Sequence, residues 1–325
     1  MSAKVLVVGG AGYIGSVTSA VLVGEGFDVV TFDDLSTGHA AAAAGTLVVG
    51  DIRDRALLTT VLREGNFDAV MHFAAKSLVG ESVAHPLRYY DVNVGGTASL
   101  ICAMQEANVP CLVFSSTCAI YGNPQYLPLD EHHPQHPVSP YGDSKKMVEA
   151  MLAACRAKED LRVTTLRYFN AAGCMPDGSL GESHKTETHL IPLAIAAALG
   201  RRPPLSLFGT DYDTRDGTCI RDYIHVLDLA DAHVKALNRL LAGDPGDSYN
   251  VGTGVGTTVR EVLAAIGRAL GQDVPHEVAE RRAGDPPALF AAADKIKREL
   301  NWNPQWTDID SIVETAVRWA QNPRF

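Results

Sequence analysis

A glycine-rich segment near the N-terminus constrains the fold more than any other part of the chain. An apolar run over residues 4–9 has the composition of a buried parallel strand, and glycines at 9, 10, 12 and 15 lead into helix-like sequence that continues to Glu25. The glycines permit a tight turn and a close approach of the backbone to a pyrophosphate, which the free N–H groups of the helix would face. Because this pattern follows a strand and opens a helix, it predicts a dinucleotide site.

Two acidic residues at strand ends extend this prediction. Asp33 follows Gly15 by 18 residues, at the end of an expected strand over residues 27–32, where a carboxylate would bind the adenosine ribose diol. Its charge would repel a 2′-phosphate, so NAD is favoured over NADP. Asp51 ends a third expected strand, over 46–49, from which a side chain would reach the adenine.

Strand-like and helix-like segments alternate through the first half of the chain. Further strands are expected at 68–73, 111–115 and 162–168, with helices at 54–64, 86–107 and 147–158. This α/β alternation predicts a Rossmann-type, doubly wound parallel sheet.

The pattern changes after about residue 170. A Gly- and polar-rich stretch over 170–186 is expected to be a loop, followed by short elements at 189–199, 205–208, 227–241, 259–270 and 309–321. We therefore expect an NAD-binding domain over 1–175 and a smaller α+β substrate domain over 176–325. Segments such as 223–241 would pack back on the first domain.

Composition excludes several classes of function. The net charge of −10 disfavours nucleic-acid binding, and an anionic small ligand would need locally focused arginines. No apolar run reaches the roughly 20 residues of a membrane span, and the N-terminus shows no signal sequence, so we expect a cytoplasmic protein. The six cysteines form no Cys-x-x-Cys pair, and we expect them to be reduced and mostly buried. Glu131, His132, His133 and His136 lie among prolines and are expected to form a polar surface loop, so no metal site is predicted.

Tyr141 and Lys145 stand four residues apart, ahead of the helix expected at 147–158. Residues at this spacing share a helical face, and an ammonium there would stabilise a phenolate and lower the tyrosine pKa from about 10. Such a pair is a proton shuttle suited to oxidising an alcohol. Exposed helices also carry such pairs by chance, so the interpretation depends on the dinucleotide site.

Thr117 stands at the carboxyl end of the strand expected at 111–115, two residues after Ser115. Ligands of open α/β sheets bind at the carboxyl ends of the strands, so its hydroxyl would face the same crevice as Tyr141. The alternative is a strand-end hydroxyl that only satisfies the backbone.

At this point the chain resembles the extended short-chain dehydrogenase/reductases, and among them the UDP-glucose (UDP-galactose) 4-epimerases. The matching segments are 9–15, 80–82, 115–122, 139–145, 166–170, 217–225 and 281–285, and the likeness runs from residue 4 to about 302. The glycine pattern and the Thr–Tyr–Lys set are typical of the superfamily, whereas the segments after 166 indicate the epimerases.

The resemblance implies roles for individual residues. Catalysis would fall to Tyr141, Lys145 and Thr117. NAD would contact Gly9, Gly12, Tyr13, Ile14, Gly15, Asp33, Asp34, Asp51, Ile52, Phe73, Ala74, Ala75, Lys145 and Phe169. The UDP-sugar would contact Thr117, Tyr141, Asn170, His189, Leu190, Phe208, Arg221, Arg282, Asp285 and Leu289. Among these, Phe208 would pack on the uracil, Arg221 and Arg282 would bind the diphosphate, and Asp285 would bind the uridine ribose. In other members an asparagine replaces His189.

Two positions depart from the family pattern. Some members have a lysine that reaches NAD where this chain has Ser77, and Lys76 lies one position earlier, so we do not assign it to the cofactor. Leu289 stands where some members have a tyrosine that restricts the 2-substituent of the sugar. The smaller leucine predicts some turnover of UDP-N-acetylgalactosamine.

The reaction implied is the interconversion of UDP-galactose and UDP-glucose by an isomerase with retained NAD, through oxidation at C4, rotation of the 4-keto sugar and re-reduction. A homodimer is expected through the helices at 86–107 and 147–158. The open alternatives are an epimerase of another UDP-sugar (a UDP-N-acetylhexosamine or a UDP-pentose), a net nucleotide-sugar oxidoreductase, and a non-catalytic NAD-binding regulator, which would be expected to lose the tyrosine or the lysine. A 4,6-dehydratase needs an acid/base pair after Thr117, where this chain has Cys118 and Ala119.

Overall fold

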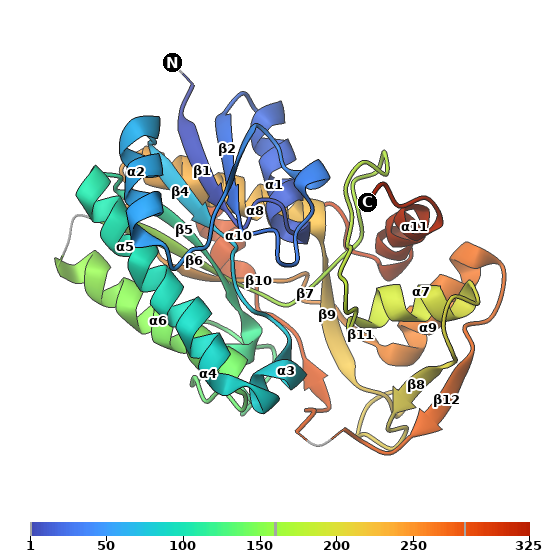
Figure 1. The fold of residues 1–325 in the computed structure, drawn as a ribbon. Helices are drawn as coiled ribbons and strands as arrows, with labels where there is room; N and C mark the ends of the chain where they lie inside the picture. The colour runs from blue at the N-terminus through green and yellow to red at the C-terminus, as the bar shows by residue number, and fades with distance from the viewer. Residues whose placement is uncertain (1, 159–160, 283) are drawn as a thin grey trace.

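A seven-stranded parallel sheet forms the centre of the molecule (Figure 1). The computed structural model describes residues 2–158, 161–282 and 284–325. The strand order is β10-β6-β5-β4-β1-β2-β3, and each pair in it is parallel. The strands are β1 (Lys4–Val8), β2 (Asp28–Asp33), β3 (Thr46–Val49), β4 (Ala69–His72), β5 (Cys111–Thr117), β6 (Arg162–Tyr168) and β10 (Ser248–Val251). The winding reverses between β1 and β4, and a ligand crevice forms at such a switch point.

Helices cover both faces of this sheet. One face carries α1 (Tyr13–Gly24), α8 (Val226–Leu241) and α10 (Asp294–Leu300), and the other carries α2 (Arg55–Gly65), α5 (Gly96–Ala107) and α6 (Pro140–Lys158). Alternate residues of β1 enter opposite layers: Val5 and Val7 join one apolar core, and Leu6 and Val8 join the other. Burial on both faces explains why β1, β4 and most of β5 are apolar, which is the signal that predicted them.

Two helical predictions for this half need correction. The single helix expected over 86–107 is instead α4 (Pro86–Tyr89), a π-helical turn η2 (Tyr90–Gly95) and α5, and α3 (Val79–Ala84) precedes them. The helix expected to start at residue 147 begins at Pro140, since proline is tolerated in a first turn, and the amide of Gly142 donates to the Ser139 hydroxyl (3.2 Å). Tyr141 and Lys145 therefore lie inside α6.

The second half of the chain builds a smaller layer and also returns to the first. Strands β9 (Ile220–His225), β11 (Gly256–Thr258) and β13 (Ala288–Leu289) form a sheet to which β7 (Asn170–Ala172) adds, and β8 (Leu205–Phe208) pairs with β12 (His276–Ala279). Helices α7 (Leu190–Ala198), α9 (Val259–Leu270) and α11 (Ile309–Gln321) pack around a separate apolar core. Strand β10 belongs to the central sheet, and α8 packs against α1. The division at 175/176 stays a prediction.

Short 3-10 turns, η1 (Ala40–Ala42) and η3 (Cys118–Ile120), complete the elements. Among the helices of the described chain, none has both the length and the apolar character that a membrane span requires.

Candidate active site

The turn between β1 and α1 is a backbone cradle that only glycine can form. Gly9 has φ +84°, and a Cβ on it would lie 2.4 Å from the backbone nitrogen of Ala74. A Cβ on Gly15 would lie 2.2 Å from the carbonyl oxygen of Gly9. Both approaches are far below van der Waals contact, so the turn is held tightly against its own helix and the end of β4.

The amino end of α1 has the features of an anion-binding site. Gly12 occupies its N-cap position, and no side chain within the described residues caps it, so first-turn N–H groups remain available. Asp33 ends β2 beside this turn, buried, and accepts hydrogen bonds from the amides of Ala11 (3.0 Å) and Leu35 (2.9 Å). Burial raises the pKa of Asp33, and these two hydrogen bonds oppose that rise. A pyrophosphate cradle beside a fixed carboxylate fits an adenine dinucleotide.

Other expected cofactor residues lie around this turn. The amides of Phe73 and Ala74 both donate to the carbonyl of Val8 (2.7 and 3.0 Å), which holds the chain after β4 against the cradle. The Tyr13 hydroxyl donates to the carbonyl of Gly173 (2.6 Å). The side chain of Ile52 packs against Gly96, where a Cβ would lie only 2.5 Å from it. The contacts of these residues with a cofactor stay predictions, as do those of Gly12, Ile14, Asp34, Ala75 and Phe169.

Asp51 and Lys76 are partly engaged within the protein. The Asp51 carboxylate accepts hydrogen bonds from Arg53 (2.9 Å), which also pairs with Asp91 (2.6 Å). The hydrogen bond from Arg53 lowers the pKa of Asp51, and the charge of Lys76 adds to this effect. The backbone amide of Lys76 donates to the side chain of Asn93 (2.8 Å), in the π-helical turn. An adenine contact for Asp51 therefore stays a prediction.

The three candidate catalytic residues lie together and are buried. Thr117 is the last residue of β5, and its hydroxyl oxygen accepts a hydrogen bond from the amide of Ala119 (3.1 Å). The hydroxyl oxygen thus does bond to the backbone, as the alternative interpretation of Thr117 expected. Its proton can still be donated to another group. Thr117 also lies close enough to the Tyr141 phenol to lower its pKa through a hydrogen bond.

Lys145 connects α6 to the same strand end. Its ammonium donates to the carbonyl oxygen of Ser115 (2.8 Å) and lies 4.7 Å from the centre of the Phe114 ring. Burial lowers the pKa of Lys145 to about 7, and the negative charge of Glu149 opposes this fall.

The acidity of the pair differs from the sequence expectation. The pKa of Tyr141 is raised well above its usual 10, chiefly because the phenol is buried. Burial disfavours the charged form of both groups, and it therefore opposes the phenolate–ammonium pair that the sequence predicts.

A buried polar network that the sequence analysis missed lies behind the lysine. Glu149, one turn after Lys145 on the same helix, pairs with Arg167 of β6 at 2.7 Å and accepts a hydrogen bond from Ser116 (2.5 Å). Arg167 also donates to the Tyr121 hydroxyl (3.1 Å), which donates in turn to Asn250 of β10 (2.6 Å). The network joins α6 to three elements. Its one sequence signal is the i, i+4 spacing of Lys145 and Glu149.

Most expected substrate residues gather on the smaller layer. Arg221 of β9 forms an ion pair with Asp285 (3.3 Å). Leu289 of β13 lies opposite Arg221 in the pairing of β13 with β9. The guanidinium of Arg282 lies 4.5 Å from the centre of the half-exposed Phe208 ring. Ala283, within the matching segment 281–285, lies outside the described residues.

Cys118 connects these residues to the catalytic group. Burial raises the pKa of its thiol to about 12, and the charge of Arg221 opposes that rise. Arg221 therefore lies near the residue that follows Thr117. Asn170 opens β7, in register with Tyr223 of β9.

His189 is placed differently from the others. It immediately precedes α7, which starts at Leu190, and its Nδ1 atom pairs with Glu182 (2.7 Å) and Glu187 (2.9 Å). Burial lowers the pKa of His189, but hydrogen bonds to the two carboxylates outweigh it and raise the pKa to about 10. The sequence analysis did not single out these glutamates.

The loop with Glu131, His132 and His133 is less exposed than expected. His133 is buried, and its Nε2 accepts a hydrogen bond from the amide of Gln125 (2.9 Å). Of the six cysteines expected to be mostly buried, Cys111, Cys174 and Cys219 are buried, whereas Cys102, Cys118 and Cys155 are only partly buried.

Comparisons with known proteins agree with this geometry. The model of the NAD dependent epimerase/dehydratase family matches residues 5–252. The UDP-glucose 4-epimerase of Rhizobium meliloti is 51% identical over 317 residues, which cover 97% of this chain and 96% of that protein. A crystal structure of the UDP-glucose 4-epimerase of Brucella ovis with NAD is 48% identical, with a TM-score of 0.96, covering 98% and 99% of the two chains. The enzyme of Bifidobacterium longum, crystallised with NAD+ and UDP, is 38% identical with a TM-score of 0.92, covering 98% and 99%.

The buried ion pair gives a testable consequence. Glu149→Gln leaves the Arg167 guanidinium buried without its counter-charge, which we expect to cost about 3 kcal/mol of stability and to lower the Tm by several degrees. Arg268→Gln, which breaks the solvent-exposed pair with Asp310, is the matched control and should change the Tm little. Thermal melts of the two variants check this. Equal melting of Glu149→Gln and the wild type would show that the pair does not hold α6 in place.

Proposed function

The chain belongs to the NAD-dependent epimerase/dehydratase family, and from this membership and its buried site we infer that it is a UDP-glucose 4-epimerase, which interconverts UDP-galactose and UDP-glucose. The observation that carries this inference is the grouping of Thr117, Tyr141 and Lys145 at the carboxyl edge of the sheet, where the glycine cradle after β1 lies two strands from β5. Relatives with this activity match the chain over nearly its whole length.

The cofactor is NAD, and the described residues fit it. The Gly9–Gly15 turn and the free amides of α1 would hold the pyrophosphate, and Asp33 would bind the adenosine ribose. A 2′-phosphate would meet the buried Asp33 carboxylate and be repelled. When bound, NAD accepts a hydride from C4 of the hexose and gives it back.

Tyr141 handles the proton of the C4 hydroxyl. As a phenolate it accepts that proton while the Thr117 hydroxyl orients the substrate oxygen. A positive charge on Lys145 would favour the phenolate, whereas burial opposes it. After the 4-keto sugar has turned over, Tyr141 returns the proton to the oxygen on the opposite face. The net redox change is zero.

The turning sugar needs an anchor away from C4. We propose that Arg221 and Arg282 hold the diphosphate by charge-assisted hydrogen bonds and that Phe208 packs on the uracil. The contact of Arg282 with the Phe208 ring supports this placement, because it puts the charged and the aromatic group side by side. Binding energy then comes from the UDP, and the hexose remains free to rotate.

The structure disfavours a dehydratase within the same family. Loss of water across C5 and C6 needs an acid and a base next to Thr117. The residues there, in η3, are an alanine and a cysteine whose thiol pKa burial raises to about 12, so neither removes a C5 proton near neutral pH. A net oxidoreductase would use the same catalytic residues. It differs from an epimerase in its product, which would be an oxidised sugar. A non-catalytic regulator is disfavoured because Tyr141 and Lys145 are both present.

The direct test is product identity. Purified protein incubated with UDP-galactose, with no NAD added, should yield UDP-glucose, identified by NMR. Tyr141→Phe should lower turnover at least about 100-fold, because the proton acceptor is gone, while the NAD content of the protein stays unchanged. Tyr126→Phe removes an exposed phenol and is the control. Near wild-type turnover in Tyr141→Phe would refute the role of Tyr141, and stoichiometric accumulation of an oxidised sugar would identify a net oxidoreductase.

Leu289 bears on which sugars are accepted. It is partly buried beside Arg221, and we propose that the leucine leaves room for a 2-acetamido group. The same assay with UDP-N-acetylgalactosamine should then give UDP-N-acetylglucosamine. No detectable product under conditions where UDP-galactose reacts would rule out this proposal.

We also propose a cytoplasmic homodimer. Val83, Leu87 and Met147 are exposed apolar residues on α3, α4 and α6, helices that contact one another, with Leu87 80% exposed. Pairing of this face with a second copy would make a helical bundle. Sedimentation should give the mass of two chains, and Leu87→Glu should give one. A wild-type mass of a single chain would contradict the dimer, and recovery in a membrane fraction would contradict the location.

A further inference from the structure

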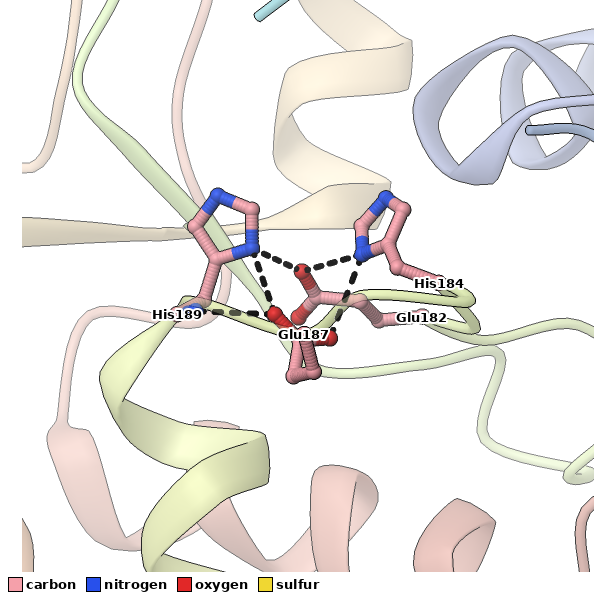
Figure 2. Close-up of side chains that lie close together, drawn as sticks. All are labelled: Glu182, His184, Glu187 and His189. Carbon is pink, nitrogen blue, oxygen red and sulfur yellow. Dashed lines mark hydrogen bonds and ion pairs between the residues drawn. The ribbon is translucent and has the colours of Figure 1, made fainter. Parts of the chain in front are cut away.

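Two histidines and two glutamates converge on the loop between β7 and α7, outside the catalytic group (Figure 2). We propose that Glu182, His184, Glu187 and His189 bind one divalent transition-metal ion, and that zinc best matches their donor atoms. The proposal is independent of the reaction inferred above. No metal site was predicted from the sequence.

The four donors are already close to the geometry of a metal site. One ligand atom from each residue lies within 4.8 Å of the others. His189 Nδ1 is 2.7 Å from a Glu182 oxygen and 2.9 Å from a Glu187 oxygen, and His184 Nδ1 is 3.5 and 3.2 Å from oxygens of the same two glutamates. Ligands of tetrahedral zinc lie at about 2.0–2.2 Å from the metal, which sets them about 3.4 Å from each other. The pairs now at 2.7–3.2 Å would move apart to reach this spacing.

The chemistry of the donors also favours zinc. Imidazole nitrogen and carboxylate oxygen are both common zinc ligands, and four of them complete a tetrahedral structural site. The two carboxylates lie together between the two imidazoles, as Figure 2 shows, and they need positive charge beside them. Either protons on the imidazoles or one divalent cation can supply it. Ligation through Nδ1 leaves Nε2 of His189 for the proposed contact with UDP.

The surrounding structure holds the ligands in place. The Trp319 indole of α11 donates to the backbone carbonyl of Glu182 (2.8 Å), and a Glu187 oxygen accepts hydrogen bonds from the amides of Thr188 (2.7 Å) and His189 (2.8 Å). The carbonyl of Ser183 contacts Nε2 of His39 (3.3 Å), and the start of the same loop accepts from the Tyr13 hydroxyl. A metal ion here would tie together a loop that touches the cofactor helix α1 and the C-terminal helix α11.

The competing histidine patch serves as a control. In the loop at 131–136, both ring nitrogens of His133 already contact backbone groups, the amide of Gln125 and the carbonyl of Pro134. His132 is exposed on that loop. His132→Asn therefore removes a surface histidine without touching the proposed site.

The experiment uses the full-length protein and the metal alone. Protein stripped with EDTA is mixed with one equivalent of ZnCl2 and desalted, and bound zinc is measured by mass spectrometry. The wild type and His132→Asn should retain about one zinc per chain. His184→Asn and Glu182→Gln should bind at least about tenfold more weakly, and zinc should raise the Tm of the wild type but not of these variants. Affinity should fall at acidic pH, where protons compete for the imidazoles.

The cobalt(II) spectrum of the wild type reports the ligands directly. It therefore tests the proposal even if a variant fails to fold. The wild type should show the visible bands of a tetrahedral nitrogen–oxygen site, without the near-ultraviolet band of a cobalt–thiolate bond. Zinc that washes off the wild type, zinc retained equally by a folded His184→Asn variant, or a cobalt–thiolate band would each overturn the proposal.

Discussion

The docking of α6 against the carboxyl ends of β5 and β6 is the constraint on which the rest of the site depends. Two buried contacts fix it: the hydrogen bond from Lys145 to the Ser115 carbonyl and the ion pair between Glu149 and Arg167. Both belong to one face of the helix, one turn apart. They bring the Tyr141 phenol to Thr117, at the strand edge where the glycine cradle opens. A buried charge is costly without its partner. Loss of either Glu149 or Arg167 would therefore destabilise the docking of α6.

The same burial that builds the site restrains its chemistry. Desolvation raises the pKa of Tyr141 and lowers that of Lys145, so burial opposes the ionised pair that proton transfer needs. A hydrogen bond from Thr117 lowers the pKa of Tyr141 and counters part of this effect. The position of Thr117 at the end of β5 therefore matters for the acidity of the phenol as well as for binding the substrate oxygen.

The inner strands β1, β4 and β5 were predictable because burial on both faces makes them apolar runs, and the glycine turn was predictable because its close contacts exclude any side chain. The start of α6 was not, since Gly142 and Asp143 are weak helix formers that the tertiary contacts of Lys145 override. Strand β10, which is only four residues long, was not predicted from the sequence. Glu149 with Arg167, and the donors from Glu182 to His189, meet only through the tertiary fold, which no local periodicity reveals.

In the proposed reaction the hydrogen on C4 leaves the sugar and returns to it within one turnover. UDP-galactose carrying deuterium at C4 can be converted in ordinary water with no added NAD, and the product examined by NMR. The account predicts UDP-glucose that retains the deuterium at C4, because the hydride never exchanges with solvent. UDP-glucose carrying solvent hydrogen at C4 would contradict it, since the stereocentre would then be inverted by proton exchange and not by reversible oxidation.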